Sequence, residues 1–295
     1  MMTTSANPQT RLDGKVAVVT GSGRGLGRAT ALELAGRGAA VVVNDLFVHE
    51  DGTPAAQRVA AEIEAAGGQA LADTHDISGF DAAAHIVSAA VETFGRLDIL
   101  VTPAGNYRPS SILDLEEDEW ESVTGVHLGG HVACMRAAAR QMIVQGDGGR
   151  IVTVSSRGGL FGTQVAYGGA KAAIMGLTSG AARELAEHGI TVNCLLPSAV
   201  TQLFSIPAGN RRFGGMPETL HMEPEYIAPL VAYLVSPAAA DVTGQFLYSA
   251  GTDICAYAQP LRLKGVTTFA RHTRGWTVEE LAAYIPAILG LHRET

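Results

Sequence analysis

Tyr167 and Lys171 are the two residues whose types and spacing most directly suggest chemistry. They lie four positions apart in the stretch AYGGAKAAIMGL (166–177), whose small residues are typical of a helix. Side chains four residues apart share one face of a helix, so the phenol and the ammonium are expected to meet. A positive charge about 4 Å away can stabilise a tyrosinate by about 3–4 kcal/mol, enough for proton exchange near neutral pH. The pair therefore predicts a tyrosine that transfers protons.

A second candidate site is the glycine-rich stretch TGSGRGLGR (20–28). Gly21, Gly25 and Gly27 fit the pattern T-G-x-x-x-G-x-G between an apolar strand and a helix. Glycine permits a tight turn and lets the backbone approach a pyrophosphate at a helix N-terminus. The order of strand, turn and helix therefore predicts a dinucleotide site.

The adenosine half of that dinucleotide would meet the ends of the next two strands. Asp45 lies 18 residues after Gly27, where a carboxylate can bind the ribose hydroxyls and repel a 2′-phosphate. This favours NAD, whereas Arg24 favours the phosphate, so NADP stays as the less favoured alternative. Asp76 and Ile77 are expected beside the adenine ring.

These motifs need a scaffold that gathers the ends of strands. Short runs of Val, Ile and Leu alternate with helical segments, which is typical of a parallel sheet covered on both faces. Ligands of such sheets bind at the carboxyl ends of the strands. We expect one Rossmann-like, doubly wound α/β domain with seven parallel strands at about 15–20, 39–45, 70–76, 97–105, 150–156, 190–197 and 244–251. The main helices are expected at about 27–38, 54–66, 116–145 and 224–234, with a further one around Tyr167.

Composition excludes several function classes. The formal charge of −8 argues against nucleic acid as a partner. No apolar run reaches the roughly 18 residues that a membrane span needs, and the polar start MMTTSANPQTR lacks the apolar core of a secretory signal. Cys134, Cys194 and Cys255 are odd in number and far apart, so we expect buried thiols in a reducing cytoplasm.

The segments TGSGRGLG, GRLDILV, VSS, YGGAK, ITVNCLLP and VTGQ occur in one order over about residues 12–257. In that order and spacing the chain resembles the short-chain dehydrogenase/reductase family. VVVNDL, VHLGGH and PEYIAPLVAYL are most similar to its subgroup with the hydroxyacyl-CoA dehydrogenase part of peroxisomal multifunctional enzymes, a 17β-hydroxysteroid dehydrogenase-like group. The resemblance implies a homodimer or homotetramer.

The resemblance also implies residue roles. Tyr167 would be the general acid/base, Lys171 would also hold the nicotinamide ribose, and Ser156 would hydrogen-bond the reacting oxygen. The cofactor contacts would extend from the glycines and acids above to Ser22, Arg24, Leu26, Ala104, Gly105, Tyr167, Lys171, Pro197 and Thr201.

Two departures from the family pattern concern loops. The family usually has Asn-Asn-Ala-Gly after the fourth strand, where this chain has TPAG (102–105), and Pro103 removes one backbone donor. Ser156 precedes Tyr167 by 11 positions instead of the family's usual 13. The loop between them is therefore shorter, and Ser155 stays an alternative to Ser156.

A third departure is His127, which replaces the usual asparagine of the long helix. The resembling subgroup also tends to have histidine there, and we expect His127 to join the proton relay. His131 follows four positions later, but Leu128 stands where a zinc protease needs glutamate, so no metal site is expected.

The expected domains are a catalytic domain over 1–257, with a substrate lid at about 199–222, and a C-terminal extension over 258–295. The lid contains Phe204 and Phe213 among other apolar residues, which favours an apolar substrate such as a hydroxyacyl-CoA or a hydroxysteroid. The extension contains WTVEELAAYIPAIL, whose capping box predicts a helix.

The chain is thus predicted to be an NAD-dependent oxidoreductase that interconverts a secondary alcohol and a ketone. Two alternatives stay open. One is a reductase of 3-ketoacyl thioesters that uses NADPH. The other is a catalytically weak NAD-binding regulator, suggested by TPAG and the short loop, against which the retained Tyr167 and Lys171 argue.

Overall fold

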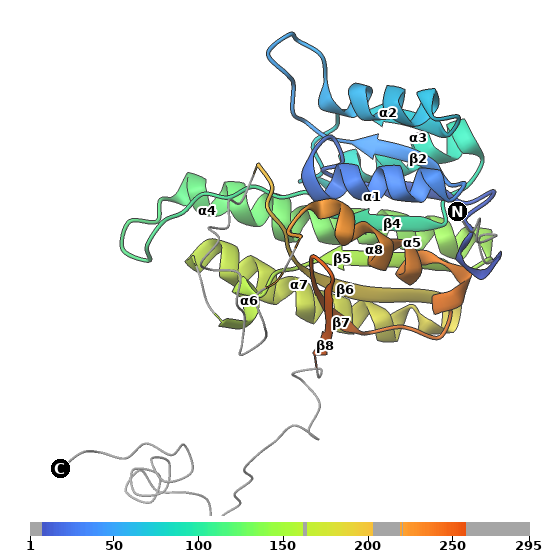
Figure 1. Cartoon of the computed structure of the whole chain (residues 1–295). Coiled ribbons are helices and arrows are strands. Elements are labelled where there is room, and N and C mark those ends of the chain that lie inside the picture. The colour runs from blue at the N-terminus through green and yellow to red at the C-terminus, as the bar shows by residue number, and fades with distance from the viewer. Residues whose placement is uncertain (1–7, 162–163, 203–218, 220, 258–295) are drawn as a thin grey trace, which may run out of the picture. The chain divides into compact units, whose positions relative to one another are not determined.

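The computed structural model describes residues 8–161, 164–202, 219 and 221–257. One eight-stranded sheet runs in the order β3-β2-β1-β4-β5-β6-β7-β8. Its strands are β1 (Val16–Val19), β2 (Ala40–Asn44), β3 (Gln69–Asp73), β4 (Ile99–Thr102), β5 (Gly149–Val154), β6 (Ile190–Ser198), β7 (Phe246–Ala250) and β8 (Asp253–Tyr257). Figure 1 shows the sheet with α1 and α8 in front of its strands.

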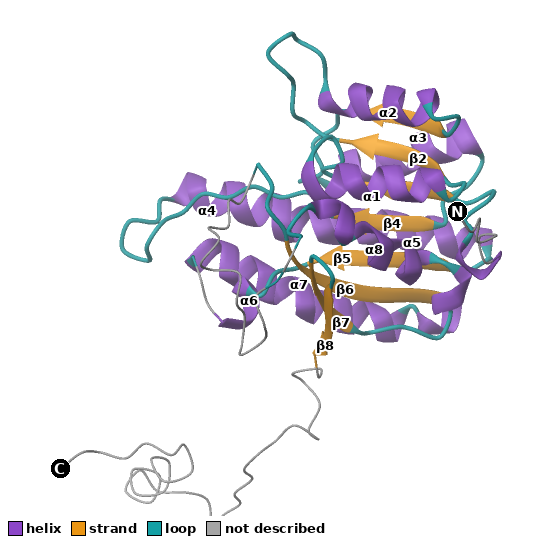
Figure 2. Cartoon of the chain, in the orientation of Figure 1, coloured by secondary structure: helices purple, strands orange, loops and turns teal. Residues whose placement is uncertain are grey.

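Helices connect the strands, as the alternating apolar pattern predicts, and Figure 2 shows this alternation. The α-helices are α1 (Gly25–Gly36), α2 (Ala55–Ala65), α3 (Phe80–Phe94), α4 (Glu117–Thr124), α5 (His131–Gln145), α6 (Gly158–Phe161), α7 (Val165–Glu184) and α8 (Ala228–Val235). The short helical turns are η1 (Pro8–Thr10), η3 (Ala186–His188), η5 (Pro224–Tyr226) and η6 (Pro237–Ala239), and η2 (Gly125–Gly130) is a π-helix.

The core explains why the strands are apolar without interruption. Alternate residues of β1 enter two different clusters: Ala17 and Val19 pack with α1, α2 and α8, whereas Val16 and Val18 pack with α3 and α5. Both faces of the sheet at β1 are therefore covered, and each of these four residues has an apolar side chain.

The sheet differs from the prediction in one strand. We expected seven parallel strands, but β8 follows β7 after a tight turn and pairs with it antiparallel, from Ala250–Asp253 to Phe246–Tyr257. Gly251 supplies the positive φ of 53° that the turn requires. The other strand pairs are parallel, as expected.

The long helix predicted over 116–145 is also interrupted. The structure replaces its centre by the π-helical segment η2, which holds His127 and joins α4 to α5. Single π turns inside α-helices frequently mark functional sites, because the wider turn re-aims a side chain.

The switch in strand order lies at β1, from which β2 and β4 depart on opposite sides. A crevice forms at the carboxyl ends of the strands at such a point. No described helix is long and apolar enough to cross a lipid bilayer. Most of the predicted lid and the whole C-terminal extension, with its predicted helix, lie outside the described residues, and the predicted domain boundary stays a prediction.

Candidate active site

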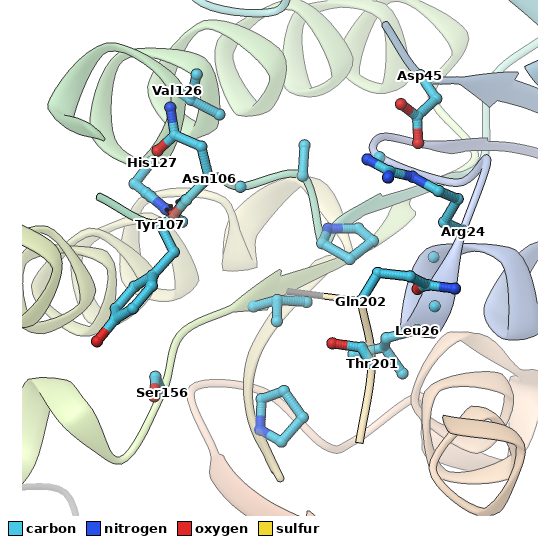
Figure 3. A pocket seen from close by; sticks show the side chains of 18 of the residues that line it. Arg24, Leu26, Asp45, Asn106, Tyr107, Val126, His127, Ser156, Thr201 and Gln202 are labelled. Atoms are coloured by element: carbon cyan, nitrogen blue, oxygen red, sulfur yellow. Dashed lines mark hydrogen bonds between the residues drawn. The ribbon is translucent and has the colours of Figure 1, made fainter. Parts of the chain in front are cut away.

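A cavity of about 740 Å³ lies at the carboxyl ends of the strands. It is lined by the loops that follow β1 to β6 and by α7. Figure 3 shows Arg24 and Asp45 at one end and His127, Tyr107 and Ser156 at the other. The predicted site residues that line it are Gly21, Arg24, Gly25, Leu26, Gly27, Asp45, Asp76, Ile77, Ala104, Gly105, His127, Ser156, Tyr167, Lys171, Pro197 and Thr201.

Ser22 is the predicted contact that does not line the cavity. It is fully buried, its hydroxyl donates to the Val19 carbonyl at 2.6 Å, and its N–H donates to the Asn44 carbonyl at 2.9 Å. The side chain therefore ties the glycine turn to the sheet, and the contact of Ser22 with the cofactor stays a prediction.

The glycine turn is shaped for close backbone contacts. A side-chain carbon on Gly21 would lie 2.6 Å from Cα of Ala104, and one on Gly27 would overlap the Gly21 carbonyl. Gly21 and Gly25 also have positive φ values of 57° and 51°. Glycine is thus required at all three positions of the predicted pattern.

The first turn of α1 faces the same cavity through Gly25, Leu26 and Gly27. Its N-cap residue, Arg24, makes no side-chain cap, and the first N–H groups of a helix have no partner within the helix. Such a terminus binds anions. The turn therefore fits a pyrophosphate, as the sequence pattern predicts.

Asp45 and Arg24 lie side by side at one end of the cavity (Figure 3). The Asp45 carboxylate accepts hydrogen bonds from the N–H groups of Gly23 and Phe47, both at 2.9 Å. The Arg24 guanidinium stacks 3.6 Å from the centre of the Phe47 ring. Asp45 and Arg24 thus both lie where the sequence predicts the adenosine ribose. Asp45 favours NAD there, and Arg24 favours NADP.

Tyr167, Lys171 and Ser156 are brought together at the other end. Tyr167 and Lys171 lie on α7, are 7% and 4% exposed, and line the cavity together with Ser156. The Lys171 Nζ lies 5.6 Å from the centre of the Tyr167 ring and donates to the Val154 carbonyl at 2.8 Å. Ser156 counteracts part of the effect of burial on Tyr167, because it lowers the pKa of the phenol.

The two adjacent serines have different partners. The Ser155 hydroxyl is buried and donates to the backbone carbonyl of Lys171 at 2.6 Å. Ser156 accepts the N–H of Gly158 at 3.1 Å and lines the cavity together with Tyr167, so its hydroxyl proton is not used by the Gly158 contact. This geometry favours Ser156 over Ser155 as the serine that meets a reacting oxygen.

The electrostatics of the pair differ from the expectation. Burial raises the pKa of Tyr167 above its usual value, and the hydrogen bond from Ser156 only partly counteracts it. Burial also lowers the pKa of Lys171, to about 7. Both groups have left water, so the neutral forms are favoured over the tyrosinate and ammonium that we expected.

His127 packs directly on the candidate general acid. Its ring meets the Tyr167 ring edge-on, with 5.3 Å between centres and 90° between planes. Its Nε2 lies 2.8 Å from the Asn106 carbonyl, and burial lowers the pKa of His127 to about 3. The imidazole is therefore neutral. Its Nε2 also lies 3.3 Å from the backbone nitrogen of Asn106, and its Nδ1 is buried without a hydrogen-bond partner among the described residues.

The sequence prediction missed several cavity residues, among them Asn106, Tyr107, Arg157 and Gln202. The Tyr107 ring meets the Tyr167 ring edge-on, with 5.4 Å between the ring centres. It is thus a second aromatic neighbour of Tyr167 besides His127. These residues directly follow predicted contacts at the ends of strands or in the lid. Their place in the chain, after a strand that points at the cavity, is the signal that could have found them.

Comparisons with known proteins agree with this geometry. A sequence profile of the family described as short chain dehydrogenase matches residues 15–205. The peroxisomal multifunctional enzyme type 2 of Drosophila melanogaster is 39% identical over 83% of this chain, which spans only 40% of that enzyme. The hydroxyacyl-CoA dehydrogenase ChsB1 of Mycobacterium tuberculosis is 37% identical, over 93% of this chain and 88% of the relative.

A solved structure is similar over nearly all of the chain. The short chain dehydrogenase of Mycobacterium avium superposes with a TM-score of 0.81 and 39% identity, over 96% of each chain.

Proposed function

The chain belongs to the short-chain dehydrogenase family, whose members are oxidoreductases of CH–OH groups with a nicotinamide cofactor, and from this premise we propose that it interconverts a secondary alcohol and a ketone with NAD. The observation that carries the proposal is the arrangement of Ser156, Tyr167 and Lys171 in the cavity at the carboxyl ends of the strands.

In this proposal, different residues of the protein bind the cofactor and act on the substrate. The turn at Gly21, Gly25 and Gly27 holds the pyrophosphate, and Lys171 holds the nicotinamide ribose. A nicotinamide bound there supplies the hydride acceptor or donor. Ser156 orients the reacting oxygen, and Tyr167 accepts or returns its proton as general base or acid.

His127 completes the arrangement as a positioning residue. Its neutral ring packs edge-on against Tyr167, and its buried Nδ1 is the ring nitrogen that the Asn106 backbone does not occupy. A pKa of about 3 argues against His127 as a proton carrier near neutral pH. Its contribution is therefore to position Tyr167.

Asp45 supports NAD over NADP, because its carboxylate is held by two backbone N–H groups at the adenosine end. A negative charge fixed there repels a 2′-phosphate. Arg24 is the observation that favours NADP, and a 3-ketoacyl thioester reductase that uses NADPH is the second candidate. The name of the hydroxyacyl-CoA dehydrogenase ChsB1 supports a hydroxyacyl-CoA as the substrate, and a hydroxysteroid is the other apolar candidate.

We further propose a homodimer or homotetramer in the cytoplasm. Gly169, Gly176 and Gly180 lie on the exposed face of α7, and among the described residues nothing is within 4 Å of a side-chain carbon added there. A second copy can pack closely on such a face. Gly130 does not belong to such an open face, because a side-chain carbon added there would lie 2.8 Å from the Ile77 side chain of its own chain.

The test is a cofactor assay with matched substrates. The purified protein is supplied with NAD⁺ or NADP⁺ and a panel of secondary alcohols, and with NADH or NADPH and the matching ketones, 3-ketoacyl-CoA included. We expect turnover of apolar secondary alcohols with NAD⁺ preferred. Turnover of 3-ketoacyl-CoA with NADPH alone would support the second candidate, and binding of NADH without any turnover would contradict an enzymatic role.

A further inference from the structure

The charges around the cavity are unevenly distributed. Among the described residues that line it, the carboxylates are Asp45 and Asp76, which follow β2 and β3 at the adenosine end. Arg24 also lies at the adenosine end, whereas Arg157 and Lys171 lie at the opposite end with Tyr167, after β5 and on α7. The half of the cavity where the substrate must react thus contains Arg157 and no carboxylate among the described lining residues, which favours a negative charge on the substrate.

Lys171 has a defined partner in that half. Its Nζ is buried and donates to the Val154 carbonyl, and the proposed function assigns the same Nζ to the cofactor. The proposed function gives no role to Arg157, the other basic residue of that half.

The backbone around Arg157 is fixed relative to the reacting groups. The Arg157 carbonyl accepts the N–H of Leu160 at 2.9 Å, and the Ser156 carbonyl accepts that of Gly159 at 3.1 Å. A side-chain carbon on Gly159 would lie 2.6 Å from the backbone nitrogen of Ala172, so the turn rests directly on α7 beside Lys171. Arg157 therefore starts from a point held against both Ser156 and Lys171.

The guanidinium itself is placed on an aromatic surface. It lies 5.0 Å from the centre of the buried Tyr248 ring. Burial lowers the pKa of Arg157, whereas Tyr248 and Tyr257 raise it. A stacked guanidinium is held flat and can offer the N–H groups of its edge, which match the two oxygens of a carboxylate.

We propose that Arg157 binds a carboxylate of the substrate, so that the substrate class is an apolar secondary alcohol or ketone that also bears a free carboxyl group. This inference rests on the proposed function for the identity of the reacting group. One guanidinium balances the single charge of a carboxylate, whereas a phosphate ester with nearly two charges would require a second cation. The carboxylate is therefore the anion that this site fits.

The direct test measures binding, which needs no turnover. Isothermal calorimetry compares hexanoate with hexanamide, two ligands of nearly equal size, on the complex of the enzyme with NADH. We expect hexanoate to bind about 10–100-fold more tightly, the range of a charge-assisted hydrogen bond. Arg157→Gln should remove this preference, and Arg157→Lys should retain part of it.

Arg24→Gln is the matched control, because it removes a cation from the other end of the same cavity. We expect it to weaken the binding of the dinucleotide and to leave the ratio between hexanoate and hexanamide unchanged. Equal binding of the two ligands to the native complex, no binding of either at millimolar concentration, or an unchanged ratio in Arg157→Gln would each overturn the proposal.

A kinetic arm separates this inference from the proposed function. With NAD⁺, Arg157→Gln should lower kcat/KM for 5-hydroxyhexanoate by about 10–100-fold and change that for its methyl ester by less than about twofold. If the native enzyme oxidises the ester but the variant affects both substrates equally, the role of Arg157 is wrong and the proposed function stands. If the native enzyme oxidises neither these nor any other secondary alcohol, the proposed function fails, while the calorimetry still decides whether Arg157 binds a carboxylate.

Discussion

Gly105 leaves the space that the His127 ring occupies. The three atoms nearest to a side-chain carbon added at Gly105 all belong to that ring, and the nearest would be closer than 3.0 Å. The His127 ring is buried and held by the Asn106 carbonyl, so it has little freedom to move.

Gly105→Ala should therefore force the imidazole away from Tyr167. Overpacking of a filled site reduces the free energy of unfolding by about 1–3 kcal/mol, and we expect turnover to fall as well. Urea unfolding and steady-state kinetics measure the two effects. Gly36→Ala, at the open end of α1, is the control and should be nearly neutral.

A double-mutant cycle makes this prediction specific. His127→Ser provides room for the added methyl group, so Gly105→Ala should destabilise the His127→Ser background less than the native protein. Strictly additive effects of the two substitutions on stability would contradict direct contact between them.

Lys171 should make the stability of the protein depend on pH. Its pKa is lowered from 10.5 to about 7 in the folded protein, so between these values the unfolded chain binds more protons. Stability must then rise with pH across this window, by up to about 1.4 kcal/mol per pH unit. We expect denaturant unfolding to show this rise between pH 7.5 and 8.5.

Lys171→Met is the matched variant, because it keeps the length of the side chain and removes the titrating amine. Its stability should be nearly constant over the same interval. The buried His127 has a lowered pKa as well, but ordinary histidines titrate below this interval, and the raised pKa values of Cys134 and Cys194 act above it. An equal slope in the variant would show that another group causes the rise.

Much of the fold could be predicted from the sequence, because a strand that is buried on both faces has a recognisable run of apolar residues. The parallel strands β1 to β7 are runs of mainly apolar residues that each end in a turn. This pattern can be recognised without knowing which strands pair with each other. Strand β8 has no such apolar run. Its exposure alternates along Asp253–Tyr257, and it exists only because the turn at Gly251 returns it to the edge of β7.

The site was predictable where one residue type is required by local geometry. Gly21, Gly25 and Gly27 follow from the turn, and the spacing of Tyr167 and Lys171 follows from the helix. The raised pKa of Tyr167 was not predictable, because it depends on burial by residues distant in the sequence. The same holds for Arg157, whose contact with Tyr248 joins β5 to β7.

Asp45 should set the preference for NAD. Asp45→Asn removes the charge and keeps one oxygen, which can accept one of the two N–H groups, of Gly23 and Phe47, that bind separate oxygens of the native carboxylate. We expect the ratio of kcat/KM for NAD⁺ over NADP⁺ to fall by about 10–100-fold. Asp45→Ala should lower this ratio as well and should also loosen the glycine turn. A native protein that already prefers NADPH would refute the assignment of Asp45.

The exposed glycines of α7 should mark the subunit interface. Gly176→Arg places a long charged side chain on this face and should convert the oligomer to a monomer. Light scattering at micromolar concentration measures the mass, and Gly36→Arg on the surface of α1 is the control. A native protein that is already monomeric would rule out the interface.

The role of Tyr167 as the proton-transferring group is tested most directly by Tyr167→Phe. The substitution removes one hydroxyl from a ring that His127 and Tyr107 hold on both sides, so the fold should remain intact. Tyr233→Phe, on the exposed surface of α8, is the matched control. The measurement is the rate of the chemical step under single-turnover conditions, together with the affinity for NADH. We predict a rate lower by about 10²–10⁴-fold with NADH affinity nearly unchanged. A rate within a few-fold of the native value would contradict the proposed mechanism.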